Sequence, residues 1–401
     1  MPNKDVPTFS GLILVSGQDR PGITQSLMRT LSQFAVKILD IEQLVIRDRL
    51  LLTVLISLDP DHAQAVSDDL ALLQDEIGLD IAVDFVQHND AKAGAETLRV
   101  VIVGDGIKPT GLAAVASEIA TLGGNITAIK RTAKQPNIAI ELELTIPNES
   151  IKTVQRALAT VAVEHRIDLA VEPGGLIRAA KRIVLLDMDS TLIQQEVIDL
   201  LAKHAGKAEV VSQITSKAMS GELDFTQALI QRVQLLAGLD SAIIEKVREE
   251  ITLMPGAQQL IERLHEQGHK VGVVSGGFID VIEPLLKSLK LDFYRANQLE
   301  IKDGKLTGGL LGQVIDRKAK KNALEEFASL ENVSISQSVA VGDGANDLDM
   351  IEAAGLGVAF NAKPYVRDRA DSALTSPYLD TILYLMGISR AEIELADKLD
   401  S

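Results

Sequence analysis

Residues 183–191 read IVLLDMDST, four apolar side chains followed at once by two aspartates. A short apolar run of this kind is typical of a strand that is buried on both faces of a parallel sheet. Residues two apart on an extended chain face the same side, so Asp187 and Asp189 are expected to point together into one site. Paired carboxylates suit chemistry in which one is a nucleophile or metal ligand and the other exchanges a proton. Two aspartates in a strand-end turn are also common without any such role.

Similar apolar runs recur after residue 180 and alternate with helical patterns. The expected strands are 270–274, 338–341 and 357–359, and the expected helices include 256–266 and 320–328. This alternation predicts an α/β domain with a doubly wound parallel sheet, which we place at residues 180–395. Sites in such sheets lie at the carboxyl ends of the strands, where the polar motifs of this chain also fall.

Ser275 and Gly276 follow the expected strand at 270–274, in the segment VVSGGF at 273–278. The pattern predicts a strand, a glycine turn and a helix. A hydroxyl and free backbone N–H groups at a helix N-terminus form an anion site, and the glycines let a phosphate approach the backbone. The segment therefore indicates a phosphate-binding loop, although by itself it is weak evidence.

Asp343 and Asp347 lie in the segment GDGAND at 342–347, after the expected strand at 338–341. A carboxylate there could complete an oxygen-rich Mg²⁺ site with Asp187 and a backbone carbonyl, and Asp347 could orient such ligands. Lys320 precedes this motif in the cation cluster RKAKK, which in isolation is typical of a solvated helix face.

Taken in order, DMDST, SGG, the lysine and GDGAND resemble the motifs of the haloacid dehalogenase superfamily, phosphotransferases with an aspartate nucleophile. The resemblance extends from Lys181 to about Gly387. Within the superfamily the sequence is similar to the phosphoserine phosphatases. Glu196 stands where that family reads the substrate amine, and Arg232 stands where it binds the substrate carboxylate. Without the resemblance, both would be interpreted as ordinary charged residues of helices.

The resemblance implies a Mg²⁺-dependent, two-step hydrolysis of O-phospho-L-serine to L-serine and phosphate, the last step of serine biosynthesis. Asp187 would attack phosphorus and form an aspartyl-phosphate, with Asp189 as general acid and then as general base. The family pattern assigns Mg²⁺ to Asp187, the backbone carbonyl of Asp189 and Asp343. It assigns a helical cap to about 200–253 and further substrate contacts to Ser275, Gly276, Lys320 and Asn346.

Two other interpretations compete with this one. A sister enzyme could act on another small phosphorylated amino acid, such as phosphohomoserine. A regulatory protein that binds amino acids could carry an inactive phosphatase domain. Every acidic residue of the motifs is present in the chain, which argues against an inactive domain.

The first part of the chain contains two similar units, at 9–88 and 96–173. Each has the order strand, helix, strand, strand, helix, strand, which predicts a ferredoxin-like βαββαβ fold. The polar segment 87–96 is typical of a linker between them. The segment GQDRPGI at 17–23 resembles the opening of an ACT domain.

The ACT resemblance implies a homodimer through these units and regulation by an amino acid, with Asp19 and Gly22 as the candidate contacts. Pro21 and Gly22 could equally form only a turn that opens a helix. The second unit has KPTG at 108–111 in place of the Asp-Arg-Pro-Gly form, so an equivalent ligand site there is doubtful.

Charge and composition narrow the possible partners. The chain has 40 Lys and Arg against 56 Asp and Glu, a net charge of −16, which argues against nucleic acid or an anionic membrane as the main partner. There is no Cys, which excludes disulfides and a cysteine nucleophile and fits a reducing compartment. Neither a signal peptide nor a membrane-spanning run is visible, so we expect a soluble, cytoplasmic protein that binds a small molecule.

Overall fold

The computed structural model describes residues 8–88, 97–134, 137–147, 149–174, 183–219, 223–390 and 393. The chain divides into two units, Met1–Gly94 and Ala95–Ser401. The predicted linker at 87–96 lies outside the described residues from 89 onward, as do the predicted boundary positions 96, 180 and 395. No helix in the described ranges is long and apolar enough to cross a membrane.

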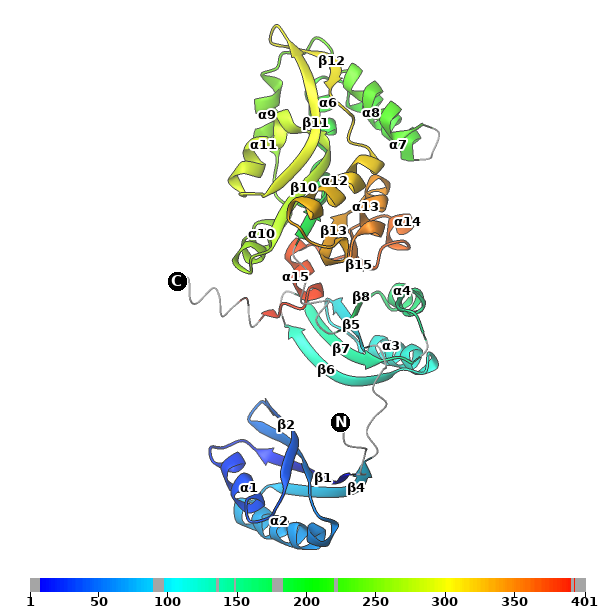
Figure 1. Ribbon diagram of the computed structural model, residues 1–401. Helices are drawn as coiled ribbons and strands as arrows, with labels where there is room; N and C mark the ends of the chain where they lie inside the picture. Colours follow the sequence, from blue (N-terminus) through cyan, green and yellow to red (C-terminus); the bar gives the residue numbers. More distant parts are fainter. Residues whose placement is uncertain are drawn as a thin grey trace. The chain divides into compact units, whose positions relative to one another are not determined.

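The first unit has the predicted βαββαβ order. Its elements are β1 (Thr8–Gln18), α1 (Ile23–Leu31), β2 (Lys37–Ile46), β3 (Arg49–Ser57), α2 (Ala63–Ile77) and β4 (Asp80–His88). The strands form an antiparallel sheet in the order β2-β3-β1-β4, and both helices cover one face of it (Figure 1). Alternate residues of β3 pack toward the helices, which is why this strand shows a period of two: Leu50, Leu52, Val54 and Ile56.

The second unit begins with another βαββαβ module, again as predicted. Its elements are β5 (Thr97–Gly104), α3 (Pro109–Thr121), β6 (Asn125–Ala133), β7 (Ile138–Thr145), α4 (Ile151–His165) and β8 (Asp168–Pro173). Pro109 occupies the first turn of α3, where its missing N–H has no intrahelical partner to lose. The KPTG segment therefore opens a helix.

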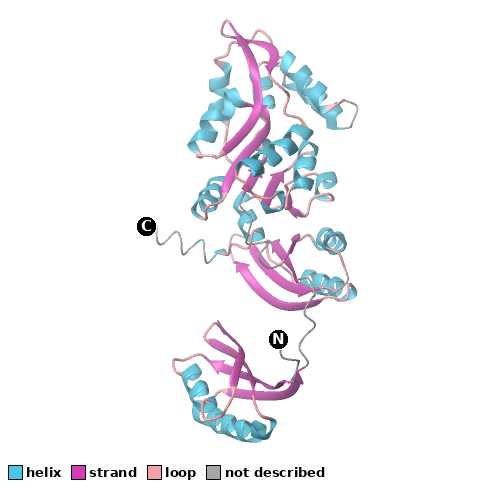
Figure 2. Ribbon diagram, in the orientation of Figure 1, coloured by secondary structure: helices cyan, strands magenta, loops and turns pink. Residues whose placement is uncertain are grey.

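The remaining chain forms the predicted doubly wound domain around a parallel sheet (Figure 2). In sheet order its parallel strands include β10 (Lys270–Phe278), β9 (Ile183–Leu186), β13 (Ser338–Gly342), β14 (Leu356–Phe360) and β15 (Ser372–Leu374). Strand β15 was not predicted, because its three residues are too few to show a period. It pairs antiparallel with β8, so one sheet runs through the second βαββαβ module and this domain.

Both faces of the central strand β9 are covered by helices. Val184 and Leu186 belong to one apolar core, with α10 (Ala257–Glu266) and α11 (Ile279–Ser288). Ile183 and Leu185 belong to another core, with α12 (Arg317–Leu330) and α13 (Leu348–Ala353). All four strand residues are fully buried, which explains the uninterrupted apolar run.

Of the helices between β9 and β10, four lie in the region predicted as a cap: α6 (Val197–His204), α7 (Ala208–Met219), α8 (Phe225–Gln234) and α9 (Ile243–Glu250). We call α6 to α9 the cap. A hairpin of β11 (Phe293–Lys302) and β12 (Lys305–Leu311) packs against it, with the Gly238 N–H donating to the Leu306 carbonyl at 2.8 Å. This contact was not predicted. Asp303 and Gly304 form the hairpin turn as expected, with φ of 52° and 74°.

Candidate active site

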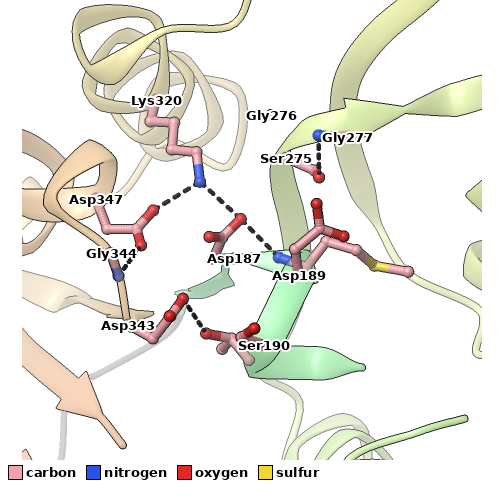
Figure 3. A network of polar contacts seen from close by, with 12 residues as sticks. Asp187, Asp189, Ser190, Ser275, Gly276, Gly277, Lys320, Asp343, Gly344 and Asp347 are labelled. Atoms are coloured by element: carbon pink, nitrogen blue, oxygen red, sulfur yellow. Dashed lines mark hydrogen bonds and ion pairs between the residues drawn. The ribbon is translucent and has the colours of Figure 1, made fainter. Parts of the chain in front are cut away.

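The centre of the site is Lys320 of α12, whose side chain is fully buried. Its Nζ lies 2.6 Å from an oxygen of Asp187 and 2.6 Å from an oxygen of Asp347, as Figure 3 shows. A lysine is almost never buried without such partners. Burial by itself lowers the pKa of Lys320, but Asp187 and Asp347 outweigh it and raise the pKa, so the ammonium stays charged. The solvated face that the cation cluster suggests in isolation is therefore wrong for Lys320.

Asp187 lies directly after β9 and is anchored through its backbone and its side chain. Its N–H donates to the carbonyl of Val341 at 2.8 Å, and its Oδ1 accepts the N–H of Met188 at 2.7 Å as well as the contact from Lys320. Burial raises the pKa of Asp187 well above its usual range, the charges of Asp347 and Asp343 raise it further, and Lys320 opposes them. The carboxylates in this pocket thus outnumber the ammonium that compensates them.

Asp343 and Asp347 follow β13 and complete an acidic cluster. Each of Asp187, Asp343 and Asp347 has an oxygen that lies within 4.8 Å of the others. Burial, Asp347 and Glu196 raise the pKa of Asp343 to about 7, against the effect of Lys320. Three carboxylates around one ammonium leave negative charge that a divalent cation would neutralise, and an all-oxygen donor set suits Mg²⁺. The residues present therefore fit the predicted metal.

Asp347 differs from the other two acids, because both of its oxygens already have partners. Oδ1 contacts Lys320, and Oδ2 accepts the N–H of Gly344 at 2.9 Å. A Cβ at Gly342 would lie 2.4 Å from Cγ of Asp347, so only glycine leaves room for this carboxylate to fold back over the strand end. This arrangement agrees with an orienting role for Asp347, with Asp187 and Asp343 nearer to a metal.

Asp189 lies beside Asp187 but in a different environment. Its Oδ1 accepts the N–H of Val197 at 3.4 Å, and in Figure 3 its carboxyl group points toward Ser275. Burial raises the pKa of Asp189 well above its usual range, and Glu196 adds to the effect, against the hydrogen bond from Val197 and the charge of Lys320. A raised pKa favours the protonated form of this carboxyl group, which could give its proton to a leaving group.

Ser275 and Gly276 face this pair of acids from β10, and here the prediction needs a correction. The glycines lie in an irregular stretch of the strand, between Val274 and Phe278, and α11 begins only at Ile279. The glycines do not form the predicted turn, because the chain stays extended and bulges before α11 starts. Ser275 is fully buried, and its Oγ accepts the N–H of Gly277 at 2.8 Å.

Asn297 of β11 holds this irregular stretch in place, a role that the sequence did not reveal. Its amide nitrogen donates to the carbonyl of Gly276 at 2.8 Å, and its amide oxygen accepts the N–H of Ile315 at 2.8 Å. The side chain is 2% exposed. Asn297 therefore ties the Ser275–Gly277 stretch to the segment that leads into α12 and Lys320.

Glu196 lies just before α6, on the cap side of the site, and its side chain is exposed. Its Oε1 accepts the hydroxyl of Ser190 at 2.7 Å. Ser190 has φ of 55°, a left-handed conformation that costs a non-glycine residue about 1 kcal/mol or more and is concentrated at functional sites. No sequence pattern predicts this serine as a partner of Glu196.

Arg232 of α8 is only 8% exposed, so the alternative of a solvated helix cation is wrong. Its Nε donates to the carbonyl of Ala228 and its Nη1 to the hydroxyl of Thr215, both at 3.3 Å. Burial lowers the pKa of Arg232, and the nearby negative charges of Asp199, Glu196 and Asp189 oppose this shift. The guanidinium thus lies in the electrostatic field of the two site acids; Asp199 and Thr215 were not anticipated.

The other predicted residues make none of the contacts of this network in the part of the chain that the structure describes. Asn346 is half-buried in the helical turn after Gly344, and its side chain forms no hydrogen bond with the residues the structure describes. Asp19 and Gly22 belong to the first unit, where both are exposed. Gly22 has φ of 98° at the start of α1, which glycine adopts without strain.

Comparison with known proteins covers almost the whole chain. A family model for haloacid dehalogenase-like hydrolases matches residues 184–352, and two ACT domain models match residues 12–84 and 96–172. Phosphoserine phosphatase SerB2 of Mycobacterium tuberculosis is 46% identical over 390 residues, which cover 97% of this chain and 95% of that protein. The phosphoserine phosphatase of Streptomyces coelicolor is 47% identical over 406 residues, which cover 98% of this chain and 96% of that protein.

A solved structure agrees with the fold. A HAD family hydrolase of Salmonella enterica serovar Typhi has a TM-score of 0.62 and 28% identity, and the match covers 72% of this chain and 98% of that one. Together with the acidic cluster and its buried lysine, these matches show that the chain belongs to the phosphoserine phosphatase family of haloacid dehalogenase-like hydrolases, with two ACT domains before the hydrolase domain.

Proposed function

We propose that the protein hydrolyses O-phospho-L-serine to L-serine and phosphate through an aspartyl-phosphate on Asp187, as the last step of serine biosynthesis. One observation carries the proposal: Asp187 contacts the buried Lys320 at 2.6 Å, whereas the neighbouring Asp189 accepts the N–H of Val197 and points toward Ser275. A nucleophile beside a fixed cation and a separate proton donor are the groups that this reaction needs.

In the first step, an oxygen of Asp187 attacks phosphorus and the bond to the serine oxygen breaks. Asp189 gives its proton to that departing oxygen, which its raised pKa favours. Lys320, the Ser275 hydroxyl and the Gly276 N–H stabilise the negative charge on the phosphoryl oxygens. The product of this step is free serine and a phosphorylated Asp187.

In the second step, water attacks the phosphorus of the aspartyl-phosphate. Asp189 is now ionised and takes a proton from the water, so each residue returns to its starting state. The cap would shield the intermediate from water until serine has left. Asn346 is a proposed further contact to the phosphorylated substrate or to the attacking water.

Mg²⁺ is the proposed metal, and the side chains of Asp187 and Asp343 with the backbone carbonyl of Asp189 would hold it. When bound, it would neutralise charge on the phosphoryl group as a Lewis acid. Asp347 would orient this set, since its oxygens are held by Lys320 and Gly344.

Substrate choice is assigned to the cap side of the site. Arg232 would bind the serine carboxylate through its planar fork of N–H groups, and Glu196 would pair with the ammonium. The hydroxyl of Ser190 supports this role by holding Glu196 at 2.7 Å.

The test of the reaction is phosphate release from O-phosphoserine by the full chain with Mg²⁺, compared with Asp187→Asn. The variant keeps the side-chain shape but removes the nucleophile, so we expect no phosphate release above the background rate. Unchanged turnover by Asp187→Asn would exclude the proposed mechanism. Faster hydrolysis of phosphohomoserine than of phosphoserine would instead reassign the substrate.

We further propose that the ACT domains form a homodimer and bind a regulatory amino acid. Strand β2 lies at a sheet edge, and it exposes six large apolar side chains: Ile38, Leu39, Ile41, Leu44, Val45 and Ile46. An open edge of this kind is normally covered by another chain. Light scattering on Leu44→Glu should give a monomer where the parent gives a dimer.

The proposed regulatory site is tested separately. If an effect of serine on activity persists in Asp19→Ala, Asp19 does not belong to that site.

A further inference from the structure

Thr215 of α7 contacts the residue that we assign to the substrate carboxylate. Its hydroxyl oxygen accepts a hydrogen bond from Nη1 of Arg232 at 3.3 Å, across from α8. We propose that Thr215 is a positioning residue for substrate selection, which holds the Arg232 guanidinium with its free N–H groups toward the bound amino acid. The inference rests on the proposed function, because it requires Arg232 to bind the carboxylate.

The hydroxyl of Thr215 is committed to the acceptor role. It has one proton, which it donates to the carbonyl of Val211 at 3.0 Å. Its lone pairs are therefore the part that faces Arg232. A hydroxyl free to rotate could turn its proton toward the guanidinium and repel it, whereas this one is fixed by its own helix.

The guanidinium keeps most of its donors available. Of its five N–H groups, Nε uses one on the carbonyl of Ala228 and Nη1 uses one on Thr215, within the described chain. Both of these hydrogen-bond acceptors are neutral, so neither forms an ion pair with Arg232. The remaining N–H groups, including both on Nη2, form the fork that a carboxylate binds in a bidentate manner.

Two anchors are needed to fix this fork. The bond from Nε to Ala228 holds the side chain at one point, about which the guanidinium plane could still swing. The contact with Thr215 is the second point, and it comes from another helix of the cap. With both in place, less conformational entropy is lost when a carboxylate binds.

The surroundings favour an acidic, zwitterionic ligand at this position. Arg232 lies near enough to Asp199, Glu196 and Asp189 for their negative charges to raise its pKa against the effect of burial. A ligand with a carboxylate for Arg232 and an ammonium for Glu196 satisfies both charges together. A ligand without the carboxylate leaves the guanidinium unpaired.

The experiment compares two substrates that differ in the carboxylate alone, O-phospho-L-serine and O-phosphoethanolamine. Thr215→Val is nearly isosteric and removes only the hydroxyl, and Thr215→Ser keeps it. Thr226→Val is the matched control, since Thr226 lies half-buried on the same helix as Arg232 and its hydroxyl has no contact with the guanidinium. KM and kcat are measured for all variants, and thermal unfolding reports the fold.

We expect Thr215→Val to raise KM for phosphoserine about tenfold, the effect of one hydrogen bond to a charged group, with kcat within about twofold of the parent. Both constants for phosphoethanolamine should stay within about twofold, as should all constants of Thr215→Ser and Thr226→Val. Arg232→Ala should remove the preference for phosphoserine.

Three results would overturn the proposal. If Arg232→Ala lowers the preference for phosphoserine and Thr215→Val does not, Thr215 has no positioning role, although the proposed function stands. An equal loss on both substrates in Thr215→Val would mean a general structural role. If Arg232→Ala also leaves the preference unchanged, the carboxylate assignment fails, and the role of Thr215 fails with it.

Discussion

Lys320 and Arg232 are both buried cations of the hydrolase domain, but their neighbours differ in kind. The ammonium of Lys320 lies 2.6 Å from each of two carboxylates, and they raise its pKa. The hydrogen bonds of Arg232 within the described chain go to two neutral oxygens at 3.3 Å, and burial lowers its pKa. The first cation has its counter-charges close at hand, and the second has neutral hydrogen-bond partners, which is why we propose a ligand for its charge.

From this difference we infer that one set of residues carries out the reaction and another set selects the substrate. Lys320, Asp187 and Asp347 form a set at the strand ends that any phosphate ester would meet. Arg232 and Glu196 belong to the cap side, where they would contact only the amino-acid part of the substrate. Changes at the strand ends should therefore affect all substrates alike, and changes in the cap should alter their ranking.

The largest effect is expected from Lys320→Met, which removes the ammonium between two buried carboxylates. We expect kcat to fall by about 10³-fold on phosphoserine and on phosphoethanolamine alike, because the phosphoryl group loses a fixed charge. Stability should fall by about 3 kcal/mol, since Asp187 and Asp347 are left unpaired in the core. Steady-state kinetics and urea unfolding measure both.

Lys321→Met is the matched control for this change. Within the described residues, Lys321 pairs with Glu325 one turn along the same helix, at 3.7 Å, and its side chain is 43% exposed. A surface pair of this kind contributes less than about 1 kcal/mol. If Lys320→Met retained turnover within tenfold of the parent, the contacts of Lys320 with Asp187 and Asp347 would not serve catalysis.

A smaller and selective effect is expected from Arg232→Ala. We expect kcat/KM for phosphoserine to fall by about 10²-fold, as losing one partner of a buried charge pair commonly costs 2 kcal/mol or more. For phosphoethanolamine it should change by less than about threefold. Gln231→Ala, at an exposed neighbour on α8, is the control. An equal loss of kcat/KM on both substrates would contradict the assignment of substrate choice to the cap.

The smallest effect is a dependence of Mg²⁺ affinity on pH. The pKa of Asp343 is raised to about 7, so falling pH protonates it and removes a ligand. The Mg²⁺ concentration for half-maximal activity should rise about tenfold per pH unit below about 7 and level off above it. In the metal-free protein, the raised pKa should lower stability as pH rises from about 4 to about 7. Equal Mg²⁺ requirements at acidic and alkaline pH would contradict this assignment.

The strand ends could be predicted from the sequence because each acid follows an apolar run. Residues 183–186 and 338–341 are buried on both faces, so their composition alone marks them as central strands and brings Asp187 and Asp343 to one edge. The two βαββαβ units were also predicted, and β3 shows the reason most clearly, because its residues alternate between core and surface.

The remaining features depend on contacts between distant segments, which no local pattern encodes. Lys320 looks like its solvated neighbours until two carboxylates from other elements surround it. Asn297 and Thr215 form hydrogen bonds to other elements, and no local pattern marks either residue for these contacts. The helix after Ser275 begins later than expected, because the local pattern does not distinguish a bulged strand from a turn.

The most direct test of the account is to stop the full enzyme with acid during turnover of ³²P-labelled phosphoserine and to map the labelled peptide. The account predicts a phosphoryl group on Asp187, at no more than one per chain, absent from Asp187→Asn and labile at alkaline pH as an acyl phosphate is. Label on another residue, or phosphate release at millisecond times with no labelled protein, would contradict it.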